Sequence, residues 1–485
     1  MKTLPFKLCA PLAFSVLLSS CEDPADPLPS GVLSVSIDSS AGPITRFATI
    51  TLERPAPVRV TYGATGTPVL TITADSNAAV HRIWLPRLRA GSEYTIEAGV
   101  PADGGVHVAE FGTGSLPADV AEIELEEIGT PTAPVALVEI ASAGAPPGGF
   151  TGLLMVERGE VVGYIRVPGA LFGSTRRANG EIVVVHPTFG LMRHRPDGSV
   201  IDQLTQPPLG VTYRRIHHDV TATPSNTLLF IANDTLTIDG THVIGESLWE
   251  WTPETGAVVK RWSSFDHLDW RTERGPPGSR SVPGNWLHGN GIKYGPRGNV
   301  VMSLRNISQV ISISPDFSTV EWRLGGASPT IPLTEAERFF GQHYVSEPAL
   351  NRILVYDNGF ARPGCATHTD AACFTRAVEY EINPVAKTAT QKWEYRHSPN
   401  KIYADLVGSA IRLSNGNTVV LFGMFGPGEP NVPSPLSSGP RTAVEVNEAG
   451  AVRWRLNFLS DNPTRIYRVT PAASLVGEQI QFPSD

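Results

Sequence analysis

The residues with the clearest chemical potential in this 485-residue sequence are three histidines and an arginine beside short apolar segments. His218, His288 and His343 stand near the beginnings of such segments, and Arg305 lies near the far end of another, in SLRN. A neutral imidazole can attack an electrophile or move a proton near pH 7, and a guanidinium presents a fork of donors that suits an oxyanion. An arginine in a tight interior is costly unless it meets a carboxylate or an anionic ligand. Together these side chains predict a site for a ligand with two or three anionic oxygens.

These residues fall at matched places in a repeat. When the repeats are aligned on the apolar residue before each inner strand's turn, a polar side chain stands two positions earlier: His218, Asn290, His343 and Ser409. Strand residues two apart share a face, so His288 should point the same way as His218, whereas His217 should point the other way. We therefore predict that the matched side chains line a central channel.

The repeat itself predicts the fold. A buried strand that begins at a Gly/Asn turn recurs at 181–186, 226–234, 299–306, 351–359 and 417–423, and an alternating hairpin follows each one. A strand, a hairpin and a further strand form a four-stranded antiparallel blade, and residues 136–167 supply a weaker sixth unit. The pattern predicts a six-bladed β-propeller over residues 118–485, closed by strand exchange between the segment near residue 120 and the C-terminus. Seven blades or an open array is the alternative.

A separate domain precedes the repeats. Residues 31–117 alternate apolar and polar side chains in short runs separated by turn residues, which predicts a small β-sandwich. Its segment LRAGSEYTIEAG resembles the Leu-x-x-Gly-x-x-Tyr corner of fibronectin type III domains. The predicted class is all-β, with a fibronectin type III-like sandwich followed by the propeller.

The N-terminal sequence predicts an export signal. Two lysines precede an apolar run that is too short to span a bilayer, and the run ends at Leu-Ser-Ser-Cys, which resembles a bacterial lipobox. We expect a lipoprotein signal peptide over 1–20, acylation of Cys21 and a tether over 21–30. A plain signal peptide with an incidental cysteine is the alternative.

Charge and cysteine usage agree with an exported protein. Without Lys2 and Lys7 of the signal, 37 basic residues stand against 47 acidic ones, a net charge of −10. Such a chain is a poor partner for nucleic acid or an anionic membrane surface. Cys365 and Cys373 remain close together, which favours a local disulfide in an oxidising compartment over two unpaired loop thiols. Four-ligand zinc patterns are absent from the sequence, and we expect no metal.

Three segments resemble a known family. HHDVTATPSNTLLFIAND, WLHGNGIKYGPRGNVVMSLRN and GQHYVSEPALNRILVYDNG are similar to the signature segments of bacterial aryl-sulfate sulfotransferases that act without phosphoadenosine phosphosulfate. That family has an N-terminal β-sandwich and a six-bladed propeller, so the resemblance extends over nearly the whole mature chain. It implies that His343 is the nucleophile that becomes sulfohistidine, while His218, His288 and Arg305 hold the sulfuryl oxygens.

The resemblance also extends to residues around these four. Asn290 matches a further polar site residue, Ser409 falls where the family can carry a threonine, and we count both with His217 as substrate-binding residues. The family's short disulfide beside the site is the expected match for the cysteine pair. Two features depart from the family: Tyr344 stands where relatives commonly have an acidic residue, and well-known members are not lipoproteins of this kind.

The implied activity is sulfuryl transfer from a phenolic sulfate ester to a phenolic acceptor, in two half-reactions with ping-pong kinetics. Its partners would be aryl sulfates and phenols, and no cofactor is implied. The chain would lie in the bacterial cell envelope, lipid-anchored, in the periplasm or on the outer surface, with a homodimer left open. One alternative is a metal oxygenase that binds iron through propeller histidines, which Arg305 disfavours because a cation beside a metal is unfavourable. The other is a non-catalytic binding or scaffold propeller in the envelope.

Replacement of Cys21 tests the lipid anchor. A Cys21→Ser variant should leave the membrane fraction or remain unprocessed, because the thiol that carries the acyl chain is gone. Fractionation and intact mass of the exported protein measure both outcomes. Unchanged processing and membrane partitioning would refute lipidation at this residue.

Overall fold

The computed structural model describes residues 31–141, 149–206, 214–273, 275, 284–366, 370–398, 402–423, 441–459, 465–476 and 479–481. The predicted all-β class is confirmed, because strands make up nearly all regular structure in these ranges and pair into seven sheets. Three short helical turns accompany them: α1 (Ala118–Ala121), η1 (Ser264–Asp266) and η2 (Arg305–Ile307). Within the same ranges, no helix has the length and apolarity needed to cross a membrane.

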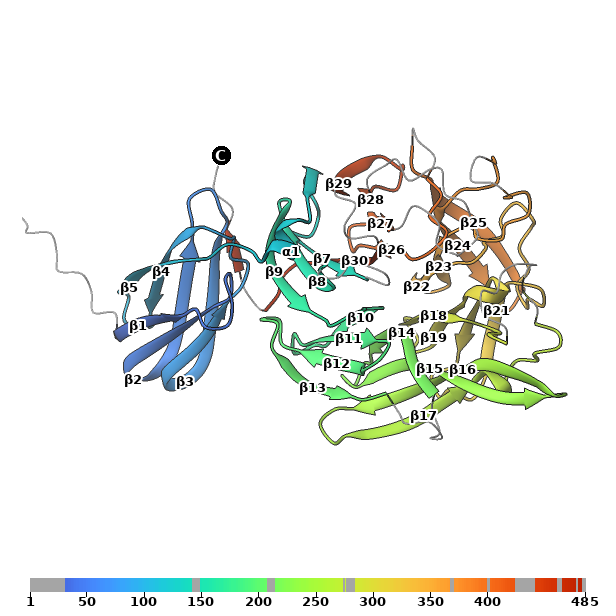
Figure 1. The fold of residues 1–485 in the computed structure, drawn as a ribbon, viewed down its shortest axis with the longest axis horizontal. Coiled ribbons are helices and arrows are strands. Elements are labelled where there is room, and N and C mark those ends of the chain that lie inside the picture. Colours follow the sequence, from blue (N-terminus) through green and yellow to red (C-terminus); the bar gives the residue numbers. More distant parts are fainter. Residues whose placement is uncertain are drawn as a thin grey trace, which may run out of the picture.

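The first sheet lies at one end of the molecule (Figure 1). Its strands are β1 (Val32–Asp38), β2 (Arg46–Gly63), β3 (Val69–Leu85), β4 (Glu93–Gly99), β5 (His107–Gly112) and β31 (Gln479–Gln481). The long strand β2 pairs with β1 through its first half and with β4 through its second half, and one apolar cluster packs across these strands. The backbone N–H of Arg89 donates to Tyr94 Oη at 2.7 Å, which is the turn-locking contact expected from the Leu-x-x-Gly-x-x-Tyr pattern.

The other six sheets hold four or five antiparallel strands each. The first comprises β10 (Ser174–Arg176), β11 (Ile182–His186), β12 (Gly190–His194) and β13 (Val200–Leu204). The second comprises β14 (Arg214–Ala222), β15 (Leu228–Ile238), β16 (Thr241–Thr252) and β17 (Ala257–Ser263). The third comprises β18 (Gly289–Tyr294), β19 (Val300–Leu304), β20 (Gln309–Ile313) and β21 (Val320–Gly325). The fourth comprises β22 (Tyr344–Ala349), β23 (Arg352–Asp357), β24 (Arg376–Asn383) and β25 (Thr388–Tyr395).

The last two sheets join distant parts of the chain. One comprises β26 (Ser409–Arg412), β27 (Thr418–Phe422), β28 (Arg441–Val446), β29 (Val452–Phe458) and β6 (Leu125–Gly129). The other comprises β30 (Ile466–Ala472), β7 (Val135–Ile140), β8 (Gly152–Glu157) and β9 (Glu160–Arg166). Strands from near residue 120 therefore pair with strands from the C-terminal part in both sheets, as the strand-exchange prediction required.

The first strands of these six sheets, β10, β14, β18, β22, β26 and β30, gather around a common centre (Figure 1). Consecutive members of this set are neighbours in space. The set closes on itself, because Arg468 Nη1 in β30 donates to the Ser174 carbonyl in β10 at 3.2 Å. Side chains at the beginnings of these strands are thereby brought together from widely separated parts of the sequence.

Neighbouring sheets pack face to face, which explains why the second strands are apolar throughout. In β19, Met302 belongs to the apolar cluster shared with the β14–β17 sheet, whereas Val301 belongs to the cluster shared with the β22–β25 sheet. A strand covered on both faces has no need of alternation. Trp262 and Trp322, at the ends of their hairpins, are buried in the same two clusters, so they act as packing residues between sheets.

A buried ion pair connects the first sheet to the β7–β9 sheet. Arg87 Nε donates to Glu157 Oε2 at 2.9 Å, and Nη2 donates to Oε1. The side chains are 0% and 5% exposed. Breaking such a pair leaves an uncompensated buried charge, so Arg87→Met should lower the free energy of unfolding by about 3–5 kcal/mol.

Denaturant unfolding of purified protein measures this effect. Arg54→Met is the matched control, because the Arg54–Asp103 pair is equally short at 3.0 Å but Arg54 is 72% exposed. It should cost less than about 1 kcal/mol. Equal losses in the two variants would contradict the importance of the buried pair.

Candidate active site

The two histidine segments at the centre have an unusual backbone. His218 has φ +60° and His288 has φ +53°, a left-handed conformation that is uncommon for residues with side chains. The strand register shifts at the same places, between Ile216 and Val220 and between Gly289 and Gly291. Side chains therefore do not alternate as in a regular strand here, and the prediction that His217 points away from His218 is wrong: the two Nδ1 atoms lie 2.7 Å apart.

Three histidines and Arg305 come together at the centre. The His218 and His288 rings lie 4.5 Å apart between centroids, and Phe172 stacks on the His218 ring at 4.9 Å. Removal from water lowers the pKa of His218 well below its usual range, and nearby His288, His217, His343 and Arg305 lower it further. Desolvation and Arg305 likewise lower the pKa of His288. The rings are therefore neutral imidazoles at pH 7.

His343 is held in one tautomer by Asn358. The Asn358 amide nitrogen donates to the carbonyls of Ala404 and Val407 at 2.8 and 2.9 Å, so its Oδ1 must face His343. That oxygen lies 2.9 Å from His343 Nδ1 and accepts a hydrogen bond from the Nδ1–H group. Desolvation and Arg305 lower the pKa of His343 to about 3, against the opposing effect of Asn358. The ring is thus neutral, and Nε2 carries a lone pair.

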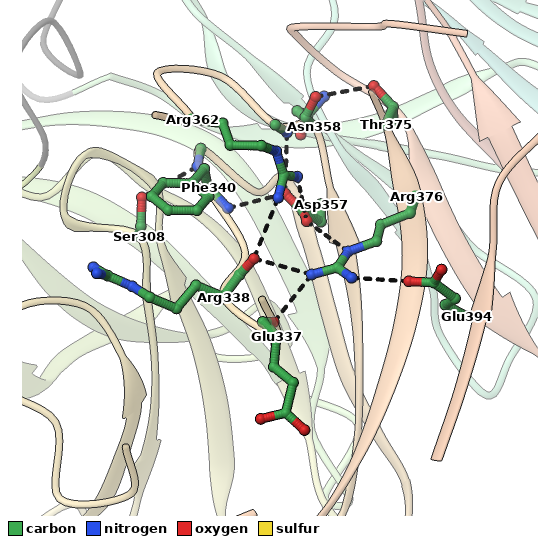
Figure 2. A network of polar contacts seen from close by, with 12 residues as sticks. Ser308, Glu337, Arg338, Phe340, Asp357, Asn358, Arg362, Thr375, Arg376 and Glu394 are labelled. Atoms are coloured by element: carbon green, nitrogen blue, oxygen red, sulfur yellow. Dashed lines mark hydrogen bonds and ion pairs between the residues drawn. The ribbon is translucent and has the colours of Figure 1, made fainter. Parts of the chain in front are cut away.

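A charge network beside Asn358 fixes this arrangement (Figure 2). Asp357 Oδ1 accepts from the backbone N–H groups of Phe340 and Gly359, at 2.9 and 3.0 Å. Its Oδ2 accepts from Arg362 and Arg376, at 2.7 and 2.9 Å. Arg376 also donates to the carbonyls of residues 337 and 338. The network therefore ties the end of β23 to the segment that leads into His343.

Arg305 is 2% exposed and begins η2 directly after β19. Its Nη1 donates to Asn306 Oδ1 at 3.2 Å, and its guanidinium lies 4.5 Å from the ring centroid of Phe360. Phe360 belongs to the segment that leads to Cys365, and the predicted Cys365–Cys373 disulfide is formed. The positive charge of Arg305 is close enough to lower the pKa values of His218, His288 and His343.

The three residues predicted to bind substrate have different surroundings. His217 Nε2 lies 2.9 Å from Glu246 Oε2, so His217 joins His218 to a buried carboxylate. Asn290 donates to the Gln342 carbonyl at 2.9 Å and accepts from Ser303 at 2.7 Å. Both residues therefore contact neighbours of the central histidines and position them.

Ser409 begins β26, the first strand of its sheet. It is fully buried and pairs with Leu421, and its hydroxyl finds no hydrogen-bond partner among the described residues. Its role as a substrate-binding residue stays a prediction.

Sequence reasoning missed the residues that hold the histidines. Asparagines lie within or just after three second strands, and each supports the histidine segment of its own sheet. Asn233, within β15, contacts His217 Nε2 at 2.9 Å; Asn306, after β19, donates to the Asn285 carbonyl at 3.0 Å; and Asn358, after β23, binds His343. The recurrence of AND, RN and DN in these segments was the available signal. Asn285 in turn contacts His288 Nδ1 at 3.0 Å, and Glu246 had no sequence signal at all.

No three His, Cys, Asp or Glu side chains within the described ranges are grouped so that they could hold a metal ion. The centre instead offers a lone-pair nitrogen, two further imidazoles and a guanidinium. Such a set of neutral nucleophile and N–H donors suits an electrophile that carries anionic oxygens.

The chain was compared with family models, curated proteins and solved structures. The family model described as Arylsulfotransferase (ASST) matches residues 154–468, well over half of the chain. No curated protein matches significantly. Similar solved structures include a catalytically inactive virginiamycin B lyase from Staphylococcus aureus with quinupristin, at 9% identity and a TM-score of 0.36, covering 70% of this chain and 100% of that one. A streptogramin B lyase has 13% identity and a TM-score of 0.34, covering 78% and 94%. Hydrazine synthase from Kuenenia stuttgartiensis has 11% identity and a TM-score of 0.30, covering 79% and 99%.

The neutral state of His343 predicts a pH dependence of stability. Its folded-state pKa of about 3 lies below the ordinary value of 6.5, so the unfolded chain binds a proton that the folded chain does not. The free energy of unfolding should therefore fall as pH drops below 6.5 and continue to fall until about pH 3. At pH 5 the loss from this one group is roughly 2 kcal/mol.

A His343→Gln variant isolates this contribution, because glutamine takes up no proton. Between pH 7 and pH 5 the stability difference between wild type and variant should shift by roughly 2 kcal/mol in favour of the variant. His242→Gln, at an exposed position, is the control and should show no such shift. Parallel pH profiles for wild type and His343→Gln would disprove the neutral buried imidazole.

Proposed function

We propose that this chain, which belongs to the arylsulfotransferase family, transfers a sulfuryl group from a phenolic sulfate ester to a phenolic acceptor through a sulfohistidine at His343. The observation that carries the proposal is the fixed tautomer of His343. With Nδ1–H bound to Asn358 and the ring neutral, Nε2 is free to attack sulfur. A nucleophile activated and oriented by a neighbouring group is the usual arrangement for covalent catalysis.

In the first half-reaction Nε2 of His343 forms a bond to sulfur as the bond from sulfur to the phenolic oxygen breaks. The electron pair of the broken bond stays on the departing phenolate. Negative charge spreads over the sulfuryl oxygens and the leaving oxygen, so donors placed at those oxygens lower the barrier. Arg305 supplies a fixed positive charge. His288 supplies an Nε2–H in the tautomer whose Nδ1 accepts from the Asn285 amide, 3.0 Å away.

In the second half-reaction the acceptor oxygen attacks sulfur, and the electron pair of the N–S bond returns to His343 Nε2. The acceptor loses its proton to a base, and the departing phenolate of the next cycle needs a proton from an acid. His218 suits both tasks, because an imidazole can exchange one proton in each direction. Entry of an anionic sulfate ester would favour the protonated form of His218 by charge compensation.

We further propose that the six sheets from β6 onward are the blades of a six-bladed β-propeller and that residues 31–117 form a β-sandwich. Support comes from the six sheets in sequence, the central set of first strands and the two strand exchanges that close the ring. The strand β31 pairs with β3, so the chain returns to the first domain at its end. Export and lipid anchoring at Cys21 belong to the same proposal and rest on the N-terminal sequence, outside the described residues.

Donor-only incubation tests the covalent step. Wild-type protein mixed with 4-nitrophenyl sulfate and no acceptor should release about one nitrophenol per active site in a burst. One SO3 group should remain on the peptide that contains His343, read by mass spectrometry under neutral or basic handling because the N–S bond is acid-labile. His343→Ala should abolish burst and adduct, while His218→Ala and His288→Ala should slow the reaction and leave some adduct.

His242→Gln serves as the control and should give a full burst. An adduct on His218 or His288 would mean that the roles are assigned wrongly. Turnover without any adduct would replace the two-step scheme with direct transfer. Binding of aryl sulfates without turnover would favour the alternative, a non-catalytic propeller that binds small molecules in the envelope.

A further inference from the structure

A buried carboxylate stands behind His218 and has no part in the mechanism described above. Glu246, in β16, is fully buried, and its Oε2 lies 2.9 Å from His217 Nε2. Its Oε1 accepts from the backbone N–H of Gly289 at 2.8 Å, directly after His288. One carboxylate therefore contacts both left-handed histidine segments.

A series of contacts connects Glu246 through His217 to His218. A carboxylate only accepts hydrogen bonds, so the His217 nitrogen facing it must carry a proton. The Asn233 amide lies 2.9 Å from the same nitrogen. Its oxygen and nitrogen ends have the same shape, so the carboxylate decides the tautomer there.

The tautomer of His217 then fixes that of His218. In the form of His217 that carries a single proton, on Nε2, the Nδ1 atom has a lone pair and lies 2.7 Å from Nδ1 of His218. His218 must donate across this contact, so its own proton is on Nδ1. Its Nε2 is left as a lone-pair nitrogen, and Phe172 and His288 both pack against the ring.

We propose that Glu246, acting through His217, is a positioning residue that makes His218 Nε2 the base for the acceptor phenol. The inference rests on the proposed function and assigns different roles to His218 and His288 within it. The acceptor's proton moves to Nε2 of His218 as its oxygen forms the bond to sulfur. The resulting His218 imidazolium keeps its hydrogen bond from Nδ1–H to His217. The Glu246 carboxylate, which binds His217, stabilises the positive charge. His288, whose tautomer is the opposite one, remains a donor to the sulfuryl oxygens.

Glu246→Gln tests this series of contacts with little change of shape. The glutamine oxygen can still accept from Gly289, but its NH2 group now donates to His217 Nε2. The His217 proton should move to Nδ1, and His218 should then carry its proton on Nε2. Each hydrogen bond between residue 246, His217 and His218 would then have its donor and acceptor exchanged. His218 Nε2 would lose the lone pair that takes the proton of the acceptor phenol.

The tautomer is measured directly by the ¹⁵N chemical shifts of labelled histidines, assigned through His218→Phe. In wild-type protein at pH 7.5, His218 should show a protonated Nδ1 and an unprotonated Nε2, and Glu246→Gln should exchange the two. This measurement needs no substrate. It therefore decides the tautomer claim even if wild type gives no burst and the proposed function fails.

Kinetics decide whether the tautomer matters. Protein preloaded with 4-nitrophenyl sulfate should transfer its SO3 group to phenol about 100-fold or more slowly in Glu246→Gln, the range expected for loss of a general base. The nitrophenol burst should keep its size, because nitrophenolate departs without needing a proton. Glu250→Gln is the matched control on the same strand, where the carboxylate binds Thr227 instead, and it should match wild type.

Three results would overturn the inference. His218 could carry its proton on Nε2 in wild type, Glu246→Gln could leave the tautomer unchanged, or it could transfer to phenol as fast as wild type. Equal slowing of burst and transfer, with an unchanged tautomer, would assign Glu246 a purely structural role.

Discussion

A buried guanidinium among uncharged imidazoles is the constraint on which the rest of the site depends. Arg305 is almost completely removed from water, and after desolvation its charge is a main cause of the low pKa values of His288 and His343. A second positive charge on a neighbouring ring would be repelled in this low-dielectric setting. His218, His288 and His343 consequently remain neutral imidazoles.

The neutral histidine rings must be held rigidly, because the proposed role of each ring requires one tautomer and one orientation. The left-handed backbone at His218 and His288 persists only where surrounding bonds over-determine it. Gly173 N–H donates to the His218 carbonyl at 2.8 Å, and Arg305 N–H donates to the His288 carbonyl at 3.2 Å. The network around Asp357 does the same for His343 (Figure 2). Fixed dipoles of this kind need no rearrangement during reaction, which is the main source of electrostatic catalysis.

The sequence predicted the strands better than the side-chain directions. Apolar runs after Gly/Asn turns marked the second strand of five sheets, because a strand packed on both faces must be apolar throughout. Alternation failed at His217 and His218, since a left-handed residue and a register shift redirect the side chains. Glu246 could not be found, because it lies in an ordinary strand and meets His217 only after the chain has folded. His218, His288 and His343 were predicted because polar residues recur at matched places in the repeat, and Arg305 because a cation in a tight interior needs an anionic partner.

Tyr344, the residue that departs from the family pattern, is explained by the charges beneath the histidines. Its ring lies between Lys293 and Arg468, at 5.6 and 5.2 Å from the cationic groups, and desolvation raises its pKa to about 12, so it is neutral. Both cations already bind Asp219, at 3.0 and 3.1 Å. Glu139 lies opposite Arg468 in the neighbouring strand. A carboxylate in place of Tyr344 would add a further negative charge next to His343, where the proposed substrate is an anionic sulfate ester. A tyrosine keeps this layer balanced while it still stabilises both cations through its ring face.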